Sequence, residues 1–346
     1  MELSRRSILT TLAAGAAALA TDRAFAEAGD LQSIYEAAKK EGQVTWYSGF
    51  LNQTICADIG NAFSQKYPGI TVNATKTTSQ VAFQRLLQDM KGGRIESDIF
   101  SSTDLSHMAF LQKKSLLIHF DPPNAKGIVP ALRDLDPKGD YYPGWLGVGA
   151  IGYNTSKLSA AEAPQDWSDL TDPKWKDKET FGSPIYSGVV GNWTVALTKL
   201  YGWDFFKKLN ALNPLIGRSF DDSITVLNSG ERLVGLANIA AVARTAAKGN
   251  PLAVNYPTSG TLVVPSATAI IAGCKSPNAA KLFLDFACGP EYSKILAENF
   301  EVPLRGDVAP PKGIKSLSDV KTLTPTLQDV ETMLPDTKSK WKDTFS

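Results

Sequence analysis

Residues 261–272 read Thr-Leu-Val-Val-Pro-Ser-Ala-Thr-Ala-Ile-Ile-Ala, a segment that is too long and too apolar for a surface loop. A continuous run rich in apolar and β-branched residues predicts a buried strand. The segment follows a long series of alternating helices and strands and precedes two further helices. We therefore expect this strand to run back from one lobe of the protein into another.

Two series of alternating elements surround this strand. The first predicts helices at 31–41, 52–67 and 79–91 and strands at 43–47, 70–75 and 98–101. The second predicts strands at 146–153, 180–184, 214–217 and 233–237 and helices at 189–201, 221–229 and 239–248, and helices at 277–288 and 290–298 follow residue 272. Helices that alternate with strands in this way predict two α/β lobes.

The length of the chain also favours two lobes. Removing residues 1–26 from the 346 leaves 320, which exceeds the roughly 250–300 residues at which a single core stops growing. No Gly-rich or Ser-rich linker is present, so we expect crossing strands to join the lobes. We place the first lobe at 27–118 and 270–305, the second lobe at 119–269 and 306–346, and a ligand cleft between them.

The first 26 residues have the pattern of an export signal. Arg5 and Arg6 precede an uncharged run at 8–20, and Ala24-Phe25-Ala26 is a small-x-small cleavage site. A retained anchor is disfavoured, because a membrane-spanning helix needs about 20 apolar residues. The paired arginines resemble the twin-arginine signal, although Ile8 replaces its usual Phe and an ordinary secretory signal is the alternative. Both routes lead out of the cytoplasm, so we expect a periplasmic protein.

Charge excludes several classes of partner. Without residues 1–26 the chain holds 33 basic and 33 acidic residues, because three arginines and two acidic residues leave with the signal. A neutral chain without a basic run lacks the charge that binds nucleic acid or an anionic membrane. The three cysteines cannot all pair within the chain. Cys274 and Cys288 flank a predicted helix that would hold them about 16 Å apart, too far for a disulfide. We therefore expect Cys56, Cys274 and Cys288 to be free, buried thiols; the alternative is a bridge, which an oxidising compartment would permit.

Four stretches of this sequence together resemble the periplasmic solute-binding proteins of ABC importers, in the branch that contains the ferric-iron-binding proteins. The stretches are 149–155 (Gly-Ala-Ile-Gly-Tyr-Asn-Thr), 166–176 (Asp-Trp-Ser-Asp-Leu-Thr-Asp-Pro-Lys-Trp-Lys), 256–261 (Tyr-Pro-Thr-Ser-Gly-Thr) and 302–308 (Val-Pro-Leu-Arg-Gly-Asp-Val). The resemblance implies a two-lobed periplasmic binding protein of type II, the "Venus flytrap", with a mixed sheet flanked by helices in each lobe. It also implies a protein that closes over a small molecule by hinge motion and docks on an inner-membrane ABC permease. We expect the protein to be a monomer.

The chain departs from the iron-binding members of this family at one position. Those members carry two adjacent tyrosines after the strand that corresponds to 233–237, whereas this chain has Asn238-Ile239-Ala240-Ala241. Ferric iron is a hard cation that needs anionic oxygen ligands, which alanine lacks. With only His107 and His119 in the chain, zinc and copper are disfavoured as well. We therefore expect no metal and no cofactor, while Tyr47, Tyr153, Tyr186 or Tyr256 keep the iron alternative open.

Candidate ligand-binding residues follow the predicted strands, because ligands of open α/β sheets bind beyond the carboxyl ends of strands. They are Ser48, Gly49, Phe50, Thr78, Ser79, Ser102, Thr103, Tyr153, Ser187, Gly188, Asn192, Arg218, Ser219, Asn238 and Tyr256. The alternative for the polar members is a helix N-cap without a ligand, and for the aromatic members a place in the core.

We expect a specific role in ligand binding for two of these candidates. Arg218 is the guanidinium expected to bind an oxyanion; alternatively it is a solvated surface residue, or Asp221 and Asp222 neutralise it. Phe50 lies in a predicted strand–helix loop and is expected to form an apolar wall against an organic ligand.

The sequence therefore predicts a binding protein that captures a small organic anion, such as a phosphonate, a phosphorylated compound or a carboxylate. The alternatives are ferric-iron capture and an exported hydrolase that uses Asp104 or a serine. No recognisable catalytic motif contains either histidine, so an enzyme is disfavoured.

Overall fold

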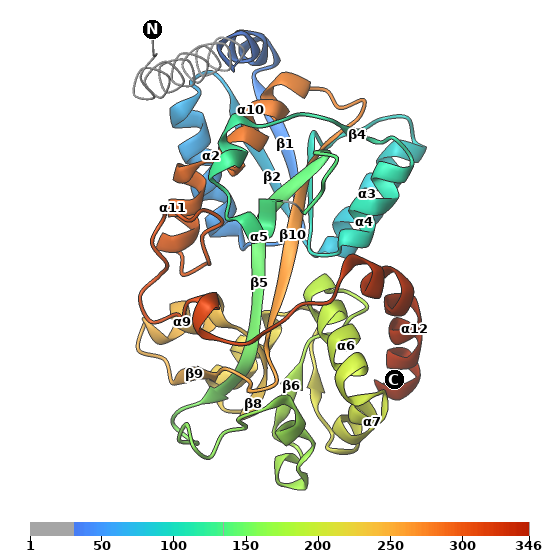
Figure 1. Cartoon of the computed structure of the whole chain (residues 1–346), viewed down its shortest axis with the longest axis vertical. Coiled ribbons are helices and arrows are strands. Elements are labelled where there is room, and N and C mark those ends of the chain that lie inside the picture. Colours follow the sequence, from blue (N-terminus) through green and yellow to red (C-terminus); the bar gives the residue numbers. More distant parts are fainter. Residues whose placement is uncertain (1–30, 134, 346) are drawn as a thin grey trace, which may run out of the picture.

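The computed structural model describes residues 31–133 and 135–345. Two lobes lie at opposite ends of the long axis, and two long strands, β5 and β10, run through both (Figure 1). The first lobe contains β1–β3 and the second contains β6–β8. The predicted export signal at 1–26 lies outside the described residues.

A single eleven-stranded sheet connects the lobes in the order β2-β1-β3-β10-β5-β8-β6-β7, with β4 and β11 paired to β10 and β9 paired to β5. The strands are β1 (Gln43–Ser48), β2 (Thr71–Lys76), β3 (Ile99–Ser102), β4 (Leu117–Ile118), β5 (Tyr141–Asn154), β6 (Glu179–Phe181), β7 (Leu215–Ile216), β8 (Val234–Asn238), β9 (Leu252–Asn255), β10 (Thr261–Ile271) and β11 (Thr322–Leu323). The sheet is mixed, as the family resemblance implied, because β1, β2 and β3 are parallel while β10 is antiparallel to β3 and to β5.

The strand predicted at 261–272 is β10, and it crosses between the lobes. It pairs with β5 from Leu262 opposite Gly149 to Ala269 opposite Tyr141. Its second half pairs with β3 of the first lobe, whereas the second half of β5 pairs with β8 and β9 of the second lobe. Each lobe therefore completes its sheet with half of both crossing strands.

The strand predicted at 146–153 begins five residues earlier than expected, at Tyr141. Proline and glycine ordinarily interrupt a strand, so the presence of Pro143 and Gly144 favoured a later start in the sequence. Here the register against β10 shifts at this point, so that Gly144 forms a β-bulge. A Cβ on Gly144 would lie 2.8 Å from Cζ of Phe50. This close packing between distant segments is why a glycine continues the strand.

Helices cover both faces of the sheet. Residues 31–41 are helical, and the named helices are α2 (Gln53–Lys66), α3 (Ser79–Lys91), α4 (Leu105–Lys113), α5 (Pro130–Arg133), α6 (Gly188–Tyr201), α7 (Asp204–Ala211), α8 (Asp222–Ser229), α9 (Ile239–Ala246), α10 (Pro277–Ala287), α11 (Pro290–Glu298) and α12 (Leu327–Phe345), with short 3₁₀ turns at Pro123–Gly127, Trp167–Thr171, Pro173–Trp175 and Leu317–Asp319. No helix in 31–133 or 135–345 is long and apolar enough to cross a membrane.

The predicted helices agree with the structure to within two residues at most ends, because their apolar spacing matches a buried face. In α2, for example, Ile55, Ile59 and Phe63 are buried, and the Phe63 ring packs edge-on against Phe283 and Phe286 of α10. Helices α4, α5, α7 and α12 have no counterpart among the predicted helices. Pro335 lies inside α12, and an internal proline ordinarily ends a helical pattern.

Helix α12 packs on the second lobe and also reaches the first. Leu334 belongs to a buried cluster with Val195 of α6. On the same helix, the Lys338 ammonium lies 3.8 Å from a carboxylate oxygen of Asp104, which caps α4 in the first lobe. Figure 1 shows α12 beside α6 and α7, with one end close to α4.

The lobe boundaries drawn from the sequence remain a proposal, and one contact argues for moving the first of them. The 3₁₀ turn Pro123–Gly127 lies against α10, because Asn124 donates two hydrogen bonds to the Asp285 carboxylate at 2.9 and 2.8 Å. We therefore propose that the change of lobe lies within β5 rather than at residue 118.

All three cysteines are free, as predicted. Cys56 and Cys288 are buried, whereas Cys274 is only half-buried. Burial raises the pKa of the Cys56 thiol to about 11, so this sulfur is protonated at neutral pH. Cys56 therefore behaves as a small packing residue.

One buried acid in the second lobe is held without a partner. Glu179 of β6 is fully buried, and neither carboxylate oxygen has a hydrogen-bond partner among the described residues. Burial raises the pKa of Glu179 to about 9. The side chain is therefore neutral at physiological pH, since a charged carboxylate would be strongly penalised here.

We expect Glu179→Gln to stabilise the protein increasingly as the pH rises. The folded state keeps a proton that the unfolded state releases near pH 4.5, so between about pH 5 and 9 the wild type loses up to about 1.4 kcal/mol of stability per pH unit. Glutamine is isosteric and does not titrate. Denaturant unfolding at pH 5 and pH 8 measures this, with the exposed Glu231→Gln as control. A stability difference that does not change with pH would show that Glu179 is ionised in the fold.

Candidate ligand site at the junction of the lobes

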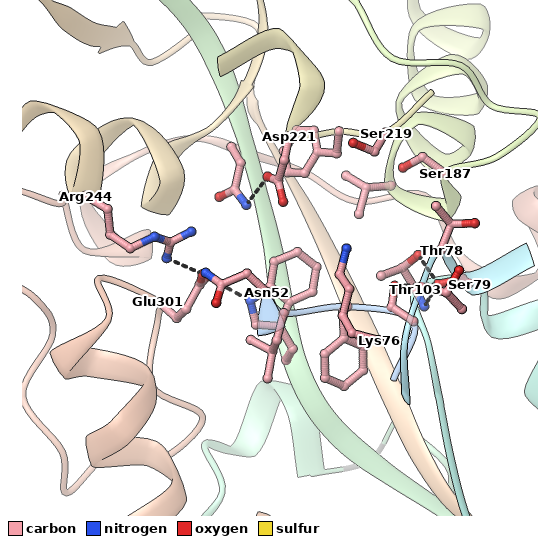
Figure 2. A pocket seen from close by; sticks show the side chains of 18 residues that line it. Asn52, Lys76, Thr78, Ser79, Thr103, Ser187, Ser219, Asp221, Arg244 and Glu301 are labelled. Atoms are coloured by element: carbon pink, nitrogen blue, oxygen red, sulfur yellow. Dashed lines mark hydrogen bonds and ion pairs between the residues drawn. The ribbon is translucent and has the colours of Figure 1, made fainter. Parts of the chain in front are cut away.

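A cavity lies where the carboxyl ends of the strands from both lobes face one another. Its lining comes from the segments after β1, β2 and β3 of the first lobe, from α6, α8 and α9 of the second lobe, and from β5 and residue 301. The lining residues are Gly49, Phe50, Leu51, Asn52, Lys76, Thr77, Thr78, Ser79, Thr103, Trp145, Ser187, Val189, Ser219, Phe220, Asp221, Asn238, Arg244 and Glu301. Figure 2 shows this cavity with its polar side chains directed inward from both lobes.

Five helices begin at the cavity wall. The residues at their N-caps, which all line the cavity, are Asn52 of α2, Thr78 of α3, Ser187 of α6, Asp221 of α8 and Asn238 of α9. A helix N-terminus carries a partial positive charge and backbone N–H groups without intrahelical partners. Convergence of several such ends is a favourable environment for an anion.

Thr78 differs from Ser187, the other hydroxyl N-cap of the site. The Ser187 hydroxyl accepts the Val190 N–H at 3.4 Å, whereas Thr78 makes no side-chain capping bond. Its Oγ1 atom is buried and has no hydrogen-bond partner in the described part of the chain. A buried hydroxyl without a partner costs free energy, so Thr78 offers a donor that a bound ligand would satisfy.

Ser79 and Thr103 form the adjoining wall. Ser79 Oγ donates to the Gly49 carbonyl oxygen at 3.0 Å, accepts the Thr103 N–H at 2.9 Å and lies 2.8 Å from Thr103 Oγ1. These bonds join the loops that follow β1 and β3 to the start of α3. Ser79 therefore positions the wall, and its own hydrogen-bonding capacity is largely used within the protein.

Two of the charged side chains that line the cavity form an ion pair with each other. Arg244 of α9 lies 2.6 Å from Glu301, and it also donates to the Asn299 carbonyl oxygen at 2.6 Å. The Trp145 indole N–H donates to the other Glu301 oxygen at 2.8 Å. Burial raises the pKa of Glu301, and the Arg244 guanidinium opposes that shift. Because Glu301 follows α11 of the first lobe, this pair also links the lobes.

The two other charges of the cavity face it from opposite lobes. Lys76 ends β2, and its side-chain ammonium makes no hydrogen bond or ion pair with any described residue. Figure 2 shows its side chain extending into the cavity, with Asp221 on the opposite side. Asp221 accepts one hydrogen bond, from the Asn238 amide at 3.0 Å. Lys76 is therefore the cation of the cavity that is available to a ligand.

Aromatic rings close one side of the site. Phe50 and Trp145 are both 4% exposed, and their rings stack with centroids 5.7 Å apart. Both line the cavity. The Phe50 ring belongs to the buried core and also lines the cavity; its expected contact with an organic ligand stays a prediction.

Eight of the residues predicted from the sequence lie in the cavity wall. They are Gly49, Phe50, Thr78, Ser79, Thr103, Ser187, Ser219 and Asn238. Each lies at or just after the carboxyl end of a strand or at the start of a helix, where ligands of open α/β sheets bind.

Seven predicted residues do not line the cavity, and four of these are engaged in the interior. Ser48 donates to the Phe50 carbonyl oxygen at 2.6 Å, and Ser102 lies 2.9 Å from Nδ1 of His107. Asn192 donates to the Gly188 carbonyl oxygen at 2.9 Å. Tyr153 is 5% exposed within β5. Adjacent residues of a strand point to opposite sides, so a position near a strand end does not settle which side chain faces the cleft.

Arg218 and Tyr256 lie outside the cavity for a different reason. The Arg218 guanidinium stacks on the Tyr186 ring at 4.8 Å, and Asp222 accepts hydrogen bonds from the Arg218 and Ser219 backbone N–H groups rather than from the guanidinium. Tyr256 accepts the Lys315 N–H through its hydroxyl at 3.2 Å. Arg218 therefore lies outside the cavity lining, whereas Lys76 is a cation within it; which of the two binds an anion stays a prediction.

Gly188 lies outside the lining but next to it, where the lobes touch. A Cβ at this residue would lie 2.9 Å from the Thr103 carbonyl oxygen and would also overlap the Thr103 hydroxyl. Gly188 begins α6 of the second lobe, and Thr103 follows β3 of the first. The glycine therefore allows the two cavity walls to approach.

Lys76, Asp221, Arg244 and Glu301 are charged cavity residues that were not predicted. Lys76 follows the same strand-end rule as its neighbours, so that signal was present in the sequence. Arg244 lies inside a helix and Glu301 in a loop 57 residues away, and no local pattern marks either. Only the meeting of α9 with the end of α11 brings them to the cavity.

The structure also tests the two alternative chemistries. The cavity lining contains no tyrosine, and no cluster of three or more His, Cys, Asp or Glu side chains that could hold a metal occurs within residues 31–133 and 135–345. Ser102, His107 and Asp104 do form a chain of contacts, at 2.9 and 3.6 Å. However, Ser102 is fully buried, and burial lowers the pKa of His107 to about 4. A substrate carbonyl has no access to this serine.

Residues 45–294 match the family described as bacterial extracellular solute-binding protein. This chain belongs to that family. The prediction made from the four sequence stretches is thereby confirmed, and the family consists of extracellular and periplasmic binding proteins that deliver small ligands to ABC permeases, not of enzymes.

Three similar proteins illustrate the range within this fold. A Salmonella typhimurium protein named "Putative 2-aminoethylphosphonate-binding periplasmic protein" is 22% identical over 361 aligned positions, which cover 99% of this chain and 98% of that protein. The periplasmic binding protein AfuA of Actinobacillus pleuropneumoniae, with fructose-6-phosphate bound, superposes with a TM-score of 0.79 at 22% identity, over 88% of this chain and 98% of AfuA. Iron-bound HitA of Pseudomonas aeruginosa gives 0.75 at 22% identity, over 87% and 99%. The type II periplasmic binding fold predicted for this solute-binding protein is thus confirmed.

Adding one methyl group at Gly188 should hold the lobes apart. We expect Gly188→Ala to weaken ligand binding at least tenfold and to enlarge the radius of gyration in small-angle X-ray scattering, with little loss of thermal stability. Opening of the lobes relieves the overlap with Thr103, so each lobe keeps its own packing. Gly306→Ala, where the new Cβ would meet Val129 at an ordinary 3.7 Å, is the control. Normal affinity in Gly188→Ala would mean that the lobes do not approach here when ligand binds.

Proposed function

We propose that this protein captures a small organic anion in the interlobe cavity and delivers it to the permease of an ABC importer. Phosphonates, phosphorylated compounds and carboxylates are the ligand classes that fit the proposal. The protein would act as a monomer in the periplasm, after export by the signal at 1–26.

One observation carries the proposal: the N-termini of five helices meet at a cavity that also contains the uncommitted ammonium of Lys76 and the unpartnered hydroxyl of Thr78. All of these groups donate hydrogen bonds or carry positive charge. An oxyanion with several acceptor oxygens can satisfy them together. The named ligands of two similar proteins, 2-aminoethylphosphonate and fructose-6-phosphate, support the phosphonate and phosphate classes.

The size of the cavity supports a small ligand. Its volume is about 50 Å³, several times the roughly 10–15 Å³ that one buried water needs. Motion of the lobes would admit the ligand and then enclose it. The stacked rings of Phe50 and Trp145 would contact the carbon part of such a molecule.

The alternatives have less support in this chain. Ferric capture would need anionic oxygen ligands, and the cavity offers only the paired Glu301 and a single further carboxylate, Asp221. The similarity to iron-bound HitA concerns the fold. A hydrolase would need an accessible nucleophile, and Ser102 is fully buried.

A thermal-unfolding screen of the purified protein tests the proposed ligand class. The compounds are phosphonates, sugar phosphates, carboxylates, amino acids, polyamines and ferric citrate. A ligand at about 100 times its dissociation constant adds roughly 2.7 kcal/mol to stability. We expect stabilisation by one class of organic anion and none by ferric citrate. Stabilisation by ferric citrate alone, with a coloured complex, would establish iron capture instead.

Substitution of one cation inside the cavity and of one cation outside it tests which residue binds the anion. Lys76→Met should weaken binding of the stabilising anion roughly 10- to 100-fold, since a charge-assisted hydrogen bond contributes about 1.5–3 kcal/mol. Arg218→Ala removes a cation that stacks on Tyr186 outside the cavity, so its affinity should equal that of the wild type. Isothermal titration calorimetry measures both. If the two variants behave in the opposite way, Arg218 is the anion-binding residue.

A further inference from the structure

The charges of the cavity divide into a paired set and an unpaired set. Arg244 and Glu301 neutralise each other at 2.6 Å and have further partners in Asn299 and Trp145. Lys76 and Asp221 remain, and within the described ranges neither is in an ion pair. They also do not pair with each other, because no contact between them falls within 4 Å. The cavity therefore presents one available charge of each sign.

These two charges belong to opposite lobes. Lys76 ends β2 of the first lobe, near the buried hydroxyl of Thr78, and Asp221 caps α8 of the second. Figure 2 shows them on different sides of the cavity, with Thr78 among the side chains of the first lobe. A ligand that spans the cavity would meet a cation at one end and a carboxylate at the other.

Asp221 is held as an acceptor. The Asn238 side-chain amide donates to its Oδ1 at 3.0 Å. The second oxygen, Oδ2, has no partner in the part of the chain that the structure describes. Asp221 also does not neutralise Arg218, whose guanidinium stacks on Tyr186. One acceptor oxygen is thus free for a donor that comes with the ligand.

We propose that the ligand is a zwitterion in which an anionic group binds at Lys76 and Thr78 and an ammonium group, on a short spacer, binds at Asp221. This inference rests on the proposed function and narrows its ligand class. A simple anion would leave the Asp221 carboxylate facing a like charge, which disfavours binding. An ammonium supplies the hydrogen-bond donors that Oδ2 lacks, and the small cavity limits the spacer to a few atoms.

Matched ligand pairs test this inference. Each pair has one anionic group and exchanges an ammonium for a methyl group of similar size: 2-aminoethylphosphonate with propylphosphonate, phosphoethanolamine with propyl phosphate, and β-alanine with butyrate. Affinities are measured by isothermal titration calorimetry on the purified protein. In any pair that binds, we expect the wild type to prefer the amino compound at least tenfold.

Asp221→Asn should remove that preference and leave the affinity for the methyl compound unchanged or higher, since the variant no longer repels an anion. Lys76→Met should weaken both members of a pair equally. Glu231→Gln, which removes an exposed charge from the same lobe, is the control and should keep the preference. Thermal unfolding of each variant verifies that the fold is retained.

The outcomes separate the inference from the proposed function. Equal affinities within a pair in the wild type, or a preference that survives in Asp221→Asn, overturn the zwitterion inference while anion capture stands. If neither member of any pair binds, and the broader anion screen also shows no stabilisation, anion capture fails and the inference fails with it.

Discussion

The antiparallel pair of β5 and β10 is the constraint on which the rest of this structure depends. Both strands pass from one lobe to the other and are hydrogen-bonded to each other from Leu262 opposite Gly149 to Ala269 opposite Tyr141. Because each lobe completes its sheet with half of this pair, the remaining strands end toward the same junction. The loops and helix starts that follow those ends are thereby brought together. A cavity rich in helix N-termini is the consequence.

Burial decides which charged side chains at the junction of the lobes must be paired and which can remain unpaired. Glu301 is 2% exposed, and an isolated charge at such a position would be strongly unfavourable. Arg244 and the Trp145 indole satisfy it, so this pair is a structural element of the wall that also joins the lobes. Lys76 and Asp221 are exposed side chains, and water can solvate them when the site is empty. They can therefore remain unpaired without a large penalty and stay available for a ligand.

Several contacts that would change when the lobes separate lie on different sides of the cavity. Arg244 of the second lobe holds Glu301 and Asn299 of the first, while Lys338 of α12 reaches the Asp104 carboxylate. His107 and Lys338 hold the pKa of Asp104 below its usual value, although burial raises it. The close approach of Gly188 to Thr103 completes the contact between the lobes. Separation of the lobes would therefore break ion pairs as well as packing contacts.

Sequence alone determined the α/β alternation, the crossing strand, the family resemblance and the strand-end rule that located Thr78, Ser187 and Asn238, because these features depend on local spacing and capping. It failed where distant segments decide the outcome. Gly144 continues β5 because of Phe50 and Thr268, and Arg244 reaches the site because α9 meets the end of α11. Tertiary structure likewise decided three features of the site. Ser48 and Ser102 point away from the cavity, Arg218 stacks on Tyr186, and Lys76 is the cation that remains available in the cavity. The physical reason is that a side chain's direction and partners depend on which elements pack against it, and local spacing does not contain that information.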